Sequence, residues 1–331
     1  MPRVVLLNRM LHRAGQDWLE ARADVMVVPA DTPPEHLVDA LASAEAIVVR
    51  LPARITKEVI AGAPRLRVIA TAGAGVDNVD IAAATAAGVP VVNNVGIGPN
   101  PVAEHAVGLM LALARRIIMG DKRLRGEGWT CRDQLLGRDL GTELSGKTVA
   151  IVGFGFIGRR VAAMCTAAFG NRVLAFDPFL DDGPFAAAKV ERRRSLRELL
   201  PEADFVTIHA PLTDETRHVI GRAELAMMKP TAYLINCARG GLVDPDALYE
   251  ALREHRIAGA GIDVFEPEPP PSANPLFGLD NVIVTPHLAG LSHETNRRLS
   301  MSAAEQVLQV LAGDRPPRLV NPEVWDRRRK A

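Results

Sequence analysis

Apolar residues follow two different spacings along this chain, and the two spacings alternate. Short runs of β-branched and other apolar residues lie near residues 5, 26, 48, 69 and 91, and the stretches between them carry apolar residues at helical spacing. Strands that alternate with helices in this way pair in parallel. The first hundred residues therefore predict a parallel sheet with helices on both faces.

A second series of the same kind follows a long helical pattern over residues 101–125, which could bridge two domains. Pro101 suits the first position of such a helix. The strand candidates of the second series are TVAIVGFG, RVLAFD, DFVTIHA, AYLINCA, AGAGID and NVIVTPH. A chain of 331 residues suits two domains. The predicted fold is thus α/β, with two doubly wound parallel-sheet lobes.

The last helical pattern, residues 292–311, begins after the second sheet is complete and would most simply return the chain to the first lobe. The first lobe is then discontinuous and comprises residues 1–98 and 292–331. Residues 99–291 form the second lobe.

Composition narrows the classes of function. The chain has 39 basic and 39 acidic residues, and this balance favours neither nucleic acid nor a membrane surface as a partner. Its longest apolar block, residues 106–114, falls short of the ~20 residues that cross a bilayer, and the first ten residues lack the apolar region of a secretory signal. Three cysteines, an odd number without a C-x-x-C pair, indicate reduced thiols, with neither a disulfide framework nor a metal site. These features predict a cytoplasmic protein.

One glycine pattern resembles a phosphate-binding loop. Residues 141–148, GTELSGKT, match the P-loop pattern G-x-x-x-x-G-K-[ST] letter for letter. A P-loop must leave a strand and enter a helix so that backbone N–H groups surround the phosphates. Lys147 and Thr148 begin a predicted strand instead. We therefore interpret this match as a turn before that strand.

A second glycine pattern, G-x-G-x-x-G, has the right context for a dinucleotide. Gly153, Gly155 and Gly158 follow the strand TVAIV and precede a helical pattern. The first glycine would permit a tight turn, the second a close approach of the pyrophosphate, and the third close packing of helix on strand. Asp177 ends the next strand 19 residues after Gly158, and a ribose-binding acid is expected about 20 residues on.

The acid at the end of that strand also bears on the choice of cofactor. A carboxylate at Asp177 would accept hydrogen bonds from both ribose hydroxyls and repel a 2′-phosphate, so NAD is favoured over NADP. The two residues that follow, Pro178 and Phe179, are not basic. The arginines at 192–194 are the main contrary signal, because folding could bring them to a 2′-phosphate.

Three residues of the second series have the chemistry that reduction of a 2-keto acid needs. Arg239, after the strand AYLIN, could bind a carboxylate with two parallel hydrogen bonds. His287, after the last strand, could carry a proton near neutral pH. Glu268, in the loop VFEPEPPP, could lie beside His287 and favour its charged form. Taken singly, each also has a plain structural interpretation: a surface arginine, a structural histidine and a loop carboxylate.

The order of motifs resembles that of D-isomer-specific 2-hydroxyacid dehydrogenases over nearly the whole chain. The motifs are AGAGVDNVD (72–80), VAEH (102–105), the glycine stretch, HAPLT (209–213), NCARGGLVD (236–244), GIDVFEPEP (261–269) and PHLAG (286–290). The resemblance implies a Rossmann NAD-binding domain, a flavodoxin-like substrate domain, and an active site in the cleft between them.

The resemblance also assigns roles to particular residues. In that family an Arg, a Glu and a His form the catalytic triad, and the matching residues are Arg239, Glu268 and His287. The implied substrate contacts are Arg50, Arg239 and the backbone N–H groups of Ala74 and Gly75. The implied cofactor contacts are Gly153, Gly155, Phe156, Ile157, Gly158, Asp177, Ala210, Cys237, Ala238, Asp263, His287, Ala289 and Gly290.

Two departures from the family pattern concern the ligands. Phe156 stands where many relatives carry a polar or basic residue near the pyrophosphate, which leaves backbone contacts and the nearby Arg159. Arg50 matches a substrate arginine of the phosphoglycerate dehydrogenase branch, yet Thr71 stands where a second arginine is expected before the AGAG loop. A phosphorylated substrate is therefore not favoured. We also expect no C-terminal regulatory domain of the kind that some of those enzymes carry.

The predicted function is transfer of a hydride between NAD and C2 of a small 2-hydroxy or 2-keto acid, by a homodimer. Dimerisation is expected by family analogy and because residues 101–125 are apolar over more of the helix than one core face requires. Formate dehydrogenase shares the fold but pairs glutamine with its histidine, and Glu268 argues against it. The remaining alternative is a corepressor-like or redox-sensing protein that binds NAD and docks partner peptides. If His287 is not the acid, His209 is the next candidate.

Overall fold

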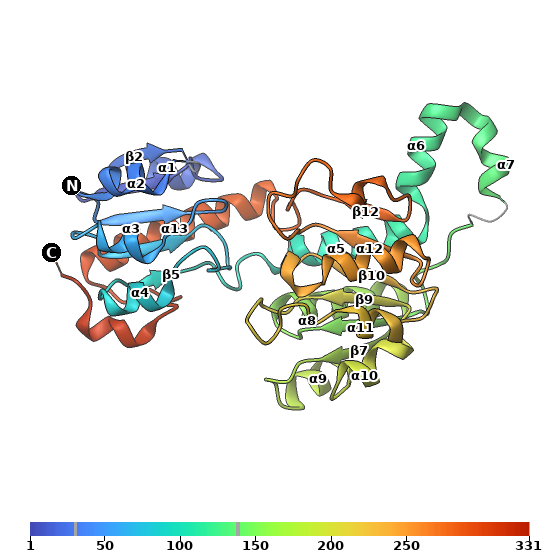
Figure 1. Ribbon diagram of the computed structural model, residues 1–331. Coiled ribbons are helices and arrows are strands. Elements are labelled where there is room, and N and C mark those ends of the chain that lie inside the picture. Colours follow the sequence, from blue (N-terminus) through green and yellow to red (C-terminus); the bar gives the residue numbers. More distant parts are fainter. Residues whose placement is uncertain (30–31, 137–139, 331) are drawn as a thin grey trace. The chain divides into compact units, whose positions relative to one another are not determined.

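The computed structural model describes residues 1–29, 32–136 and 140–330 (Figure 1). The chain divides into two compact units, Met1–Gly98 with Leu291–Ala331, and Pro99–Gly290. The sequence placed the return to the first unit one residue later, at residue 292. Among the described residues, no helix is long and apolar enough to cross a membrane.

The first unit contains a parallel sheet of five strands in the order β2-β1-β3-β4-β5. This is the flavodoxin-like order, in which chain direction along the sheet reverses once. The strands are β1 (Arg3–Leu7), β2 (Asp24–Val28), β3 (Ala46–Val49), β4 (Val68–Thr71) and β5 (Val91–Val92).

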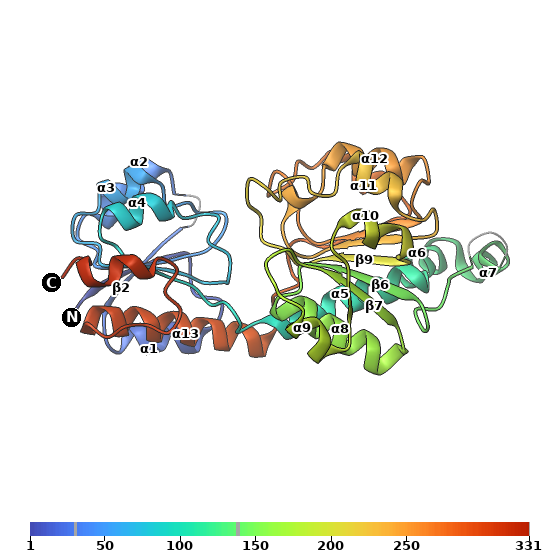
Figure 2. The ribbon, with the colours of Figure 1, turned by 90° about the horizontal axis from the view of Figure 1, so that it is seen from below.

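Both faces of this sheet are covered by helices, as Figure 2 shows. Along β1, successive side chains point to opposite faces, so that Val4 and Leu6 join one core cluster and Val5 and Leu7 the other. The first cluster lies under α1 (Arg13–Glu20) and α13 (His293–Ala312), and the second under α2 (Pro34–Leu41), α3 (Lys57–Ala61) and α4 (Ile81–Ala86). The last predicted helix is thus α13, whose first turn is capped by the side chain of Ser292.

The second unit contains a parallel sheet of seven strands in the order β12-β11-β10-β9-β6-β7-β8. With β6 counted as the first strand of this unit, the order is that of the Rossmann fold with β12 added at one edge. The order of the strands reverses between β6 and β9. The strands are β6 (Thr148–Val152), β7 (Arg172–Phe176), β8 (Glu191–Arg192), β9 (Phe205–Ile208), β10 (Tyr233–Asn236), β11 (Gly259–Ile262) and β12 (Val282–Val284).

Alternation along β6 again separates two cores, with Val149 and Ile151 on one face and Ala150 and Val152 on the other. The first face is covered by α5 (Pro99–Ala114), α8 (Phe156–Phe169) and α9 (Gly183–Ala188), and the second by α10 (Leu196–Leu199), α11 (Arg222–Met227) and α12 (Pro245–Arg253). Short 3₁₀ helices are Gly128–Thr130, Leu200–Glu202, Gly240–Leu242, Pro275–Gly278 and Pro322–Arg327. The predicted α/β class with two parallel sheets is confirmed.

The prediction of one long helix over residues 101–125 is wrong in one respect, because the chain forms two helices there. The first, α5, ends at Ala114, and α6 (Ile117–Glu127) starts after Arg116, whose φ is 55°. In a continuous helix the carbonyl of Ala114 would accept from the N–H of residue 118. It accepts instead from the N–H of Thr142, at 2.8 Å. The returning segment near Thr142 therefore helps to end α5.

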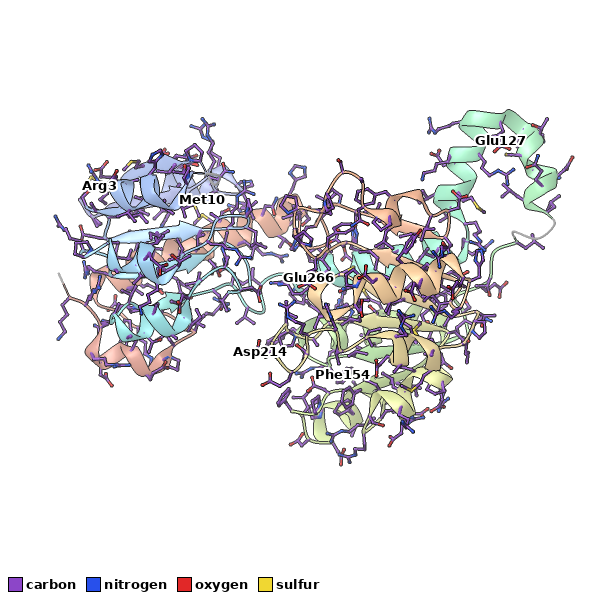
Figure 3. The ribbon with its side chains drawn as sticks, in the orientation of Figure 1. Arg3, Met10, Glu127, Phe154, Asp214 and Glu266 are labelled. Atoms are coloured by element: carbon purple, nitrogen blue, oxygen red, sulfur yellow. The ribbon has the colours of Figure 1, made fainter. Side chains whose placement is uncertain are left out.

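The second helix of that region forms an arm. In Figure 1, α6 and α7 (Cys131–Leu135) reach away from the sheet of the second unit, and Glu127 at the end of α6 is labelled in Figure 3. The residues of α6 are all at least partly exposed. We return to this arm below.

Strand β8 was not predicted from the sequence. It consists of Glu191 and Arg192 and pairs with β7 at the edge of the sheet. Two charged residues give no apolar alternation, so the usual signal for a strand is absent.

Candidate active site

The candidate site residues of the second unit follow six strands of one parallel sheet. The turns after β6, β7, β9, β10, β11 and β12 all lie at the carboxyl edge of that sheet, because the strands run in the same direction. In open α/β sheets, ligands bind outside this edge, where the strand order reverses. Here the reversal lies between β6 and β9.

The turn from β6 into α8 has the form that a dinucleotide requires. Gly153 has a φ of 90°, and a Cβ there would lie 2.6 Å from the backbone N of Ala210, which follows β9. A Cβ on Gly158 would lie 2.3 Å from the carbonyl oxygen of Gly153. By contrast, a Cβ on Gly155 would meet no atom within 4 Å. Two glycines thus permit close backbone packing, and the third faces open space that a pyrophosphate can approach.

The start of α8 adds backbone donors to this turn. Gly155 is the N-cap residue, and among the described residues no side chain caps the helix. The first N–H groups of a helix lack partners within it and attract anions. Phe156 is 62% exposed, whereas Nε of Arg159 donates to the carbonyl of Phe154 at 3.1 Å. Phe154, labelled in Figure 3, is buried and stacks on Phe185, with 4.8 Å between the ring centroids. The residues present therefore fit a nucleotide pyrophosphate.

Asp177 lies directly after β7 and faces the same turn. Its Oδ2 accepts from the backbone N–H of Phe154 at 2.9 Å, and its Oδ1 accepts from the N–H of Phe179 at 3.0 Å. Each carboxylate oxygen can accept a further hydrogen bond. The side chain is thus held in one orientation and retains acceptor capacity for the two hydroxyls of a ribose.

Glu268 and His287 contact each other. Nδ1 of His287 and a carboxylate oxygen of Glu268 form a hydrogen-bonded pair, and about a third of each side chain is exposed. The histidine follows β12, and the glutamate lies in the proline-rich loop after β11. With Nδ1 engaged by the carboxylate, Nε2 is the ring nitrogen left to face a ligand.

The backbone around His287 is organised by Asp263, which is buried at the end of β11. Its Oδ1 accepts from the N–H of Leu288 at 2.8 Å, and its Oδ2 accepts from the N–H of Ala289 at 2.9 Å. The N–H of His287 donates to the backbone carbonyl of Asp263 at 2.8 Å. The hydroxyl of Thr285 donates to the same carboxylate. One buried acid thus fixes the turn in which His287 adopts a φ of 53°.

The loop that carries Glu268 is anchored by an ion pair two residues earlier. Glu266, labelled in Figure 3, accepts from His218 Nε2 at 2.9 Å and also pairs with Arg217. Burial alone would raise the pKa of Glu266, but the bonds from His218 and Arg217 hold it below its ordinary value. The loop therefore starts from a charged, fixed residue.

Arg239 lies between β10 and the 3₁₀ helix Gly240–Leu242. Its Nη1 donates to the carbonyl of Ala238 at 2.7 Å, and its own carbonyl accepts from Nδ2 of Asn236 at 2.8 Å. A Cβ on Gly240 would lie 2.0 Å from the carbonyl oxygen of Phe265. The arginine loop therefore packs directly on the loop that leads to Glu268.

Cys237, another predicted cofactor contact, is buried at the start of this loop. Burial, with the nearby charge of Asp263, raises the pKa of its thiol far above the ordinary value. The side chain is therefore a neutral thiol rather than a nucleophile.

The predicted substrate residues Arg50, Ala74 and Gly75 belong to the other unit. Arg50 follows β3 and, with Ala72 and Ser300, lines a small cavity; its Nε is buried and has no hydrogen-bond partner among the described residues. The carbonyl of Ala74 accepts from Nδ2 of Asn93 at 2.8 Å. Their role toward a substrate stays a prediction.

Two further residues of the sequence interpretation have local roles. The hydroxyl of the buried Thr71 donates to the carbonyl of Gly73 at 3.0 Å and so supports the loop after β4. Nε2 of His209 lies 2.9 Å from the hydroxyl of Thr207, and burial lowers the pKa of His209 to about 3. A ring that is neutral at pH 7 cannot donate as an imidazolium, so His209 is a poor substitute for His287 as the acid.

Comparison with known proteins identifies the class to which this site belongs. The family described as "D-isomer specific 2-hydroxyacid dehydrogenase, NAD binding domain" matches residues 107–289. The chain is 39% identical to a glyoxylate reductase of Korarchaeum cryptofilum over 97% of this chain and 96% of that protein. It is 41% identical to a D-3-phosphoglycerate dehydrogenase of Methanocaldococcus jannaschii over 96% of this chain, which spans only 59% of that relative's length.

A solved structure gives the same result for the fold. An NADPH-dependent glyoxylate/hydroxypyruvate reductase from Sinorhizobium meliloti, in complex with NADP and malonate, is 26% identical, with a TM-score of 0.87 over 100% of this chain and 99% of that one. The chain therefore belongs to the D-isomer specific 2-hydroxyacid dehydrogenase family, a family of dehydrogenase enzymes. The family predicted from the sequence motifs is confirmed, as is an NAD(P)-binding domain in the second unit.

A substitution at Asp263 tests the anchoring of the histidine turn. In Asp263→Asn, one oxygen becomes an NH₂ group, which cannot accept the bond from Leu288 or Ala289. Leaving a buried N–H without its acceptor costs about 1–3 kcal/mol. We expect the free energy of unfolding to fall by that amount, which lowers the urea midpoint, and we expect lower turnover. The exposed Asp280→Asn is the matched control, and equal midpoints for the two variants would contradict the anchoring role.

Proposed function

We propose that the protein reduces small, unphosphorylated 2-keto acids to 2-hydroxy acids with NADH. The observation that carries this proposal is the hydrogen-bonded pair of His287 and Glu268, held on the buried Asp263 at the sheet edge that also carries the glycine turn. The names of the relatives, glyoxylate reductase and phosphoglycerate dehydrogenase, support a substrate of the 2-keto acid class.

The cofactor, when bound, supplies the hydride that is added to C2 of the substrate. The chain supplies the proton, because the imidazolium of His287 can donate from Nε2 to the oxygen on C2 while Nδ1 stays bonded to Glu268. The carboxylate of Glu268 stabilises the charged ring before donation. The guanidinium of Arg239 binds the carboxylate of the substrate and polarises its carbonyl. In the oxidative direction the neutral ring of His287 takes the proton back.

A panel of 2-keto acids tests this function. Glyoxylate, pyruvate, hydroxypyruvate and 3-phosphohydroxypyruvate are each incubated with NADH, and absorbance of the reduced nicotinamide is followed. We expect rapid consumption with at least one of the first three acids and a lower kcat/KM with the phosphorylated one, since Thr71 replaces the second arginine expected in that branch. No consumption with any acid would favour the alternative, an NAD-binding sensor that docks a partner.

The cofactor preference depends on the carboxylate of Asp177. A 2′-phosphate brought against it would face a fixed negative charge, whereas a 2′-hydroxyl would donate a hydrogen bond. We expect a kcat/KM for NADH well above that for NADPH, and a smaller ratio in Asp177→Ala, mostly through the KM for NADH. Equal efficiency of the wild-type protein with the two cofactors would contradict this preference.

Loss of the proton donor and loss of the carboxylate binder should differ in their kinetics. His287→Ala should lower turnover by about 10²- to 10⁴-fold, which is typical of a lost general acid. Arg239→Ala should also raise the KM for the keto acid, because the guanidinium is proposed both to bind and to polarise. Steady-state kinetics at saturating NADH measure both effects. Near wild-type turnover of His287→Ala, under conditions where chemistry limits the rate, would place the acid elsewhere.

The pair of Glu268 and His287 also predicts a pH dependence. Reduction needs the imidazolium and oxidation the neutral ring, so the two directions should have opposite pH preferences. Glu268→Gln keeps a hydrogen-bonding side chain but removes the charge that favours the imidazolium. The pH profiles of kcat in the two directions test the first expectation. We expect kcat for reduction to fall in Glu268→Gln, and a kcat equal to that of the wild-type protein would show that the carboxylate does not assist proton donation by His287.

We further propose that the protein is a homodimer that assembles through the arm. Ile117, Leu124, Trp129, Leu136 and Leu140 are each between 47% and 74% exposed, an unusual concentration of apolar surface on one segment. A second copy would cover these side chains. Light scattering at micromolar concentration should give twice the 35.6 kDa of one chain. A mass of one chain for the wild-type protein would contradict the dimer. In Trp129→Lys, the equilibrium between dimer and monomer should shift toward the monomer.

A further inference from the structure

A cluster of charged residues lies beside Asp177, the proposed ribose ligand. It comprises Arg192 on β8, Arg194 just after that strand, and Asp182, which precedes α9. Arg192 pairs in register with Ala175 of β7, so its backbone lies beside a position two residues before Asp177. The cluster is thus near the position where the 2′-hydroxyl of the adenosine ribose would lie.

Arg192 is held in place by the fold. Its side chain is only 14% exposed, and its guanidinium lies 5.0 Å from the centre of the Phe185 ring, over which it packs. Its Nη2 lies 3.4 Å from the carbonyl oxygen of Asp177, and its Nε is buried and has no hydrogen-bond partner in the part of the chain that the structure describes. The positive charge therefore stays close to Asp177 through contacts that do not involve Asp182.

Asp182 engages both arginines. Its Oδ1 accepts from Arg192 Nη1 at 2.7 Å, and its two oxygens accept from Arg194 Nη2 at 2.9 and 3.1 Å. Hydrogen bonding from Arg192, and the charge of Arg194, lower the pKa of the Asp182 carboxyl, so that it is ionised at neutral pH. One carboxylate thus occupies donors of two guanidinium groups, which are the groups that bind phosphates best.

We propose that Asp182 is a specificity-determining residue that excludes NADP by occupying Arg192 and Arg194 and by placing a second negative charge near Asp177. The proposal rests on the proposed role of Asp177 at the ribose. A 2′-phosphate would compete with Asp182 for these two guanidinium groups, and it would meet two carboxylates instead of one. Removing Asp182 leaves Arg192 in place and makes its donors available to the phosphate.

The test uses nucleotides that require no knowledge of the substrate. Binding of 2′,5′-ADP and of 5′-AMP to the full-length wild-type protein and to Asp182→Asn is measured by calorimetry. A hydrogen bond to a charged group is worth about 1.5–3 kcal/mol, so we expect the Kd for 2′,5′-ADP to fall by about 10-fold or more. The Kd for 5′-AMP should change by less than about 2-fold, because it lacks the phosphate on the 2′ position. Asp182→Ser should give the same result.

Two further variants separate this mechanism from a general change in charge. Glu202→Gln also removes a carboxylate that pairs with two arginines, Arg172 and Arg193. Arg172 lies at the opposite end of β7, and Arg193 keeps its bond to Glu191, so this variant should leave both affinities unchanged. Adding Arg192→Ala to Asp182→Asn should abolish most of the gain for 2′,5′-ADP.

Three results would overturn the proposal: no gain in Asp182→Asn and Asp182→Ser, an equal gain in Glu202→Gln, or a gain that survives the addition of Arg192→Ala to Asp182→Asn. The proposed preference of the wild-type protein for NADH over NADPH is tested separately. If that protein uses NADPH as well as NADH, neither Asp177 nor Asp182 excludes NADP. If it prefers NADH and the Asp182 variants show no gain for 2′,5′-ADP, the role of Asp177 stands and that of Asp182 is wrong.

Discussion

A buried carboxylate must have its lone pairs satisfied or be neutralised, because an unpaired charge inside a protein is costly. Asp263 meets this requirement with the N–H groups of Leu288 and Ala289 and with the hydroxyl of Thr285. The segment after β12 therefore has to turn closely around the end of β11. That turn places His287 in a left-handed conformation with Nδ1 against Glu268. The proposed chemistry depends on this arrangement, since a histidine on an unconstrained loop would have no fixed partner.

The parallel sheet brings the rest of the site to the same edge. Gly153 allows the turn after β6 to approach the backbone after β9, Gly158 lets the start of α8 pack on that turn, and Gly240 allows the arginine loop to touch the segment before Glu268. The nearest atom in each of these contacts is a backbone atom, so a side chain at any of the three positions would force the packed segments apart. Glycine thus sets the spacing of the loops, and the charged residues then act from fixed positions.

Much of this could be predicted from the sequence because the signals are local. Short apolar runs predicted the strands of both sheets except β8, and the spacing of the three glycines predicted the turn into α8. The break at Arg116 could not be predicted, because it depends on a bond from Thr142, 28 residues after Ala114. The helical pattern of residues 101–125 continues through the break, and only the tertiary contact redirects the chain.

The candidate site shows the same limit. The sequence interpretation included Asp263 as a cofactor contact, but its anchoring of the histidine turn depends on which backbone groups reach it in the fold. The arginines at 192–194 are a contrary signal for the NAD preference in the sequence, whereas the pairing of Arg192 and Arg194 with Asp182 is seen only once β8 lies beside β7. Ion pairs between distant residues carry no periodic signal in the sequence.

The central claim is that this protein adds a hydride and a proton across the C2 carbonyl of a 2-keto acid. Its most direct test is the reduction of a 2-keto acid of three or more carbons, chosen as the one reduced fastest, with NADH that carries two deuterium atoms at C4 of the nicotinamide. We expect a product with one deuterium at C2, by NMR, and with the D configuration, by chiral chromatography. A product without deuterium at C2, or one of L or mixed configuration, would contradict the account.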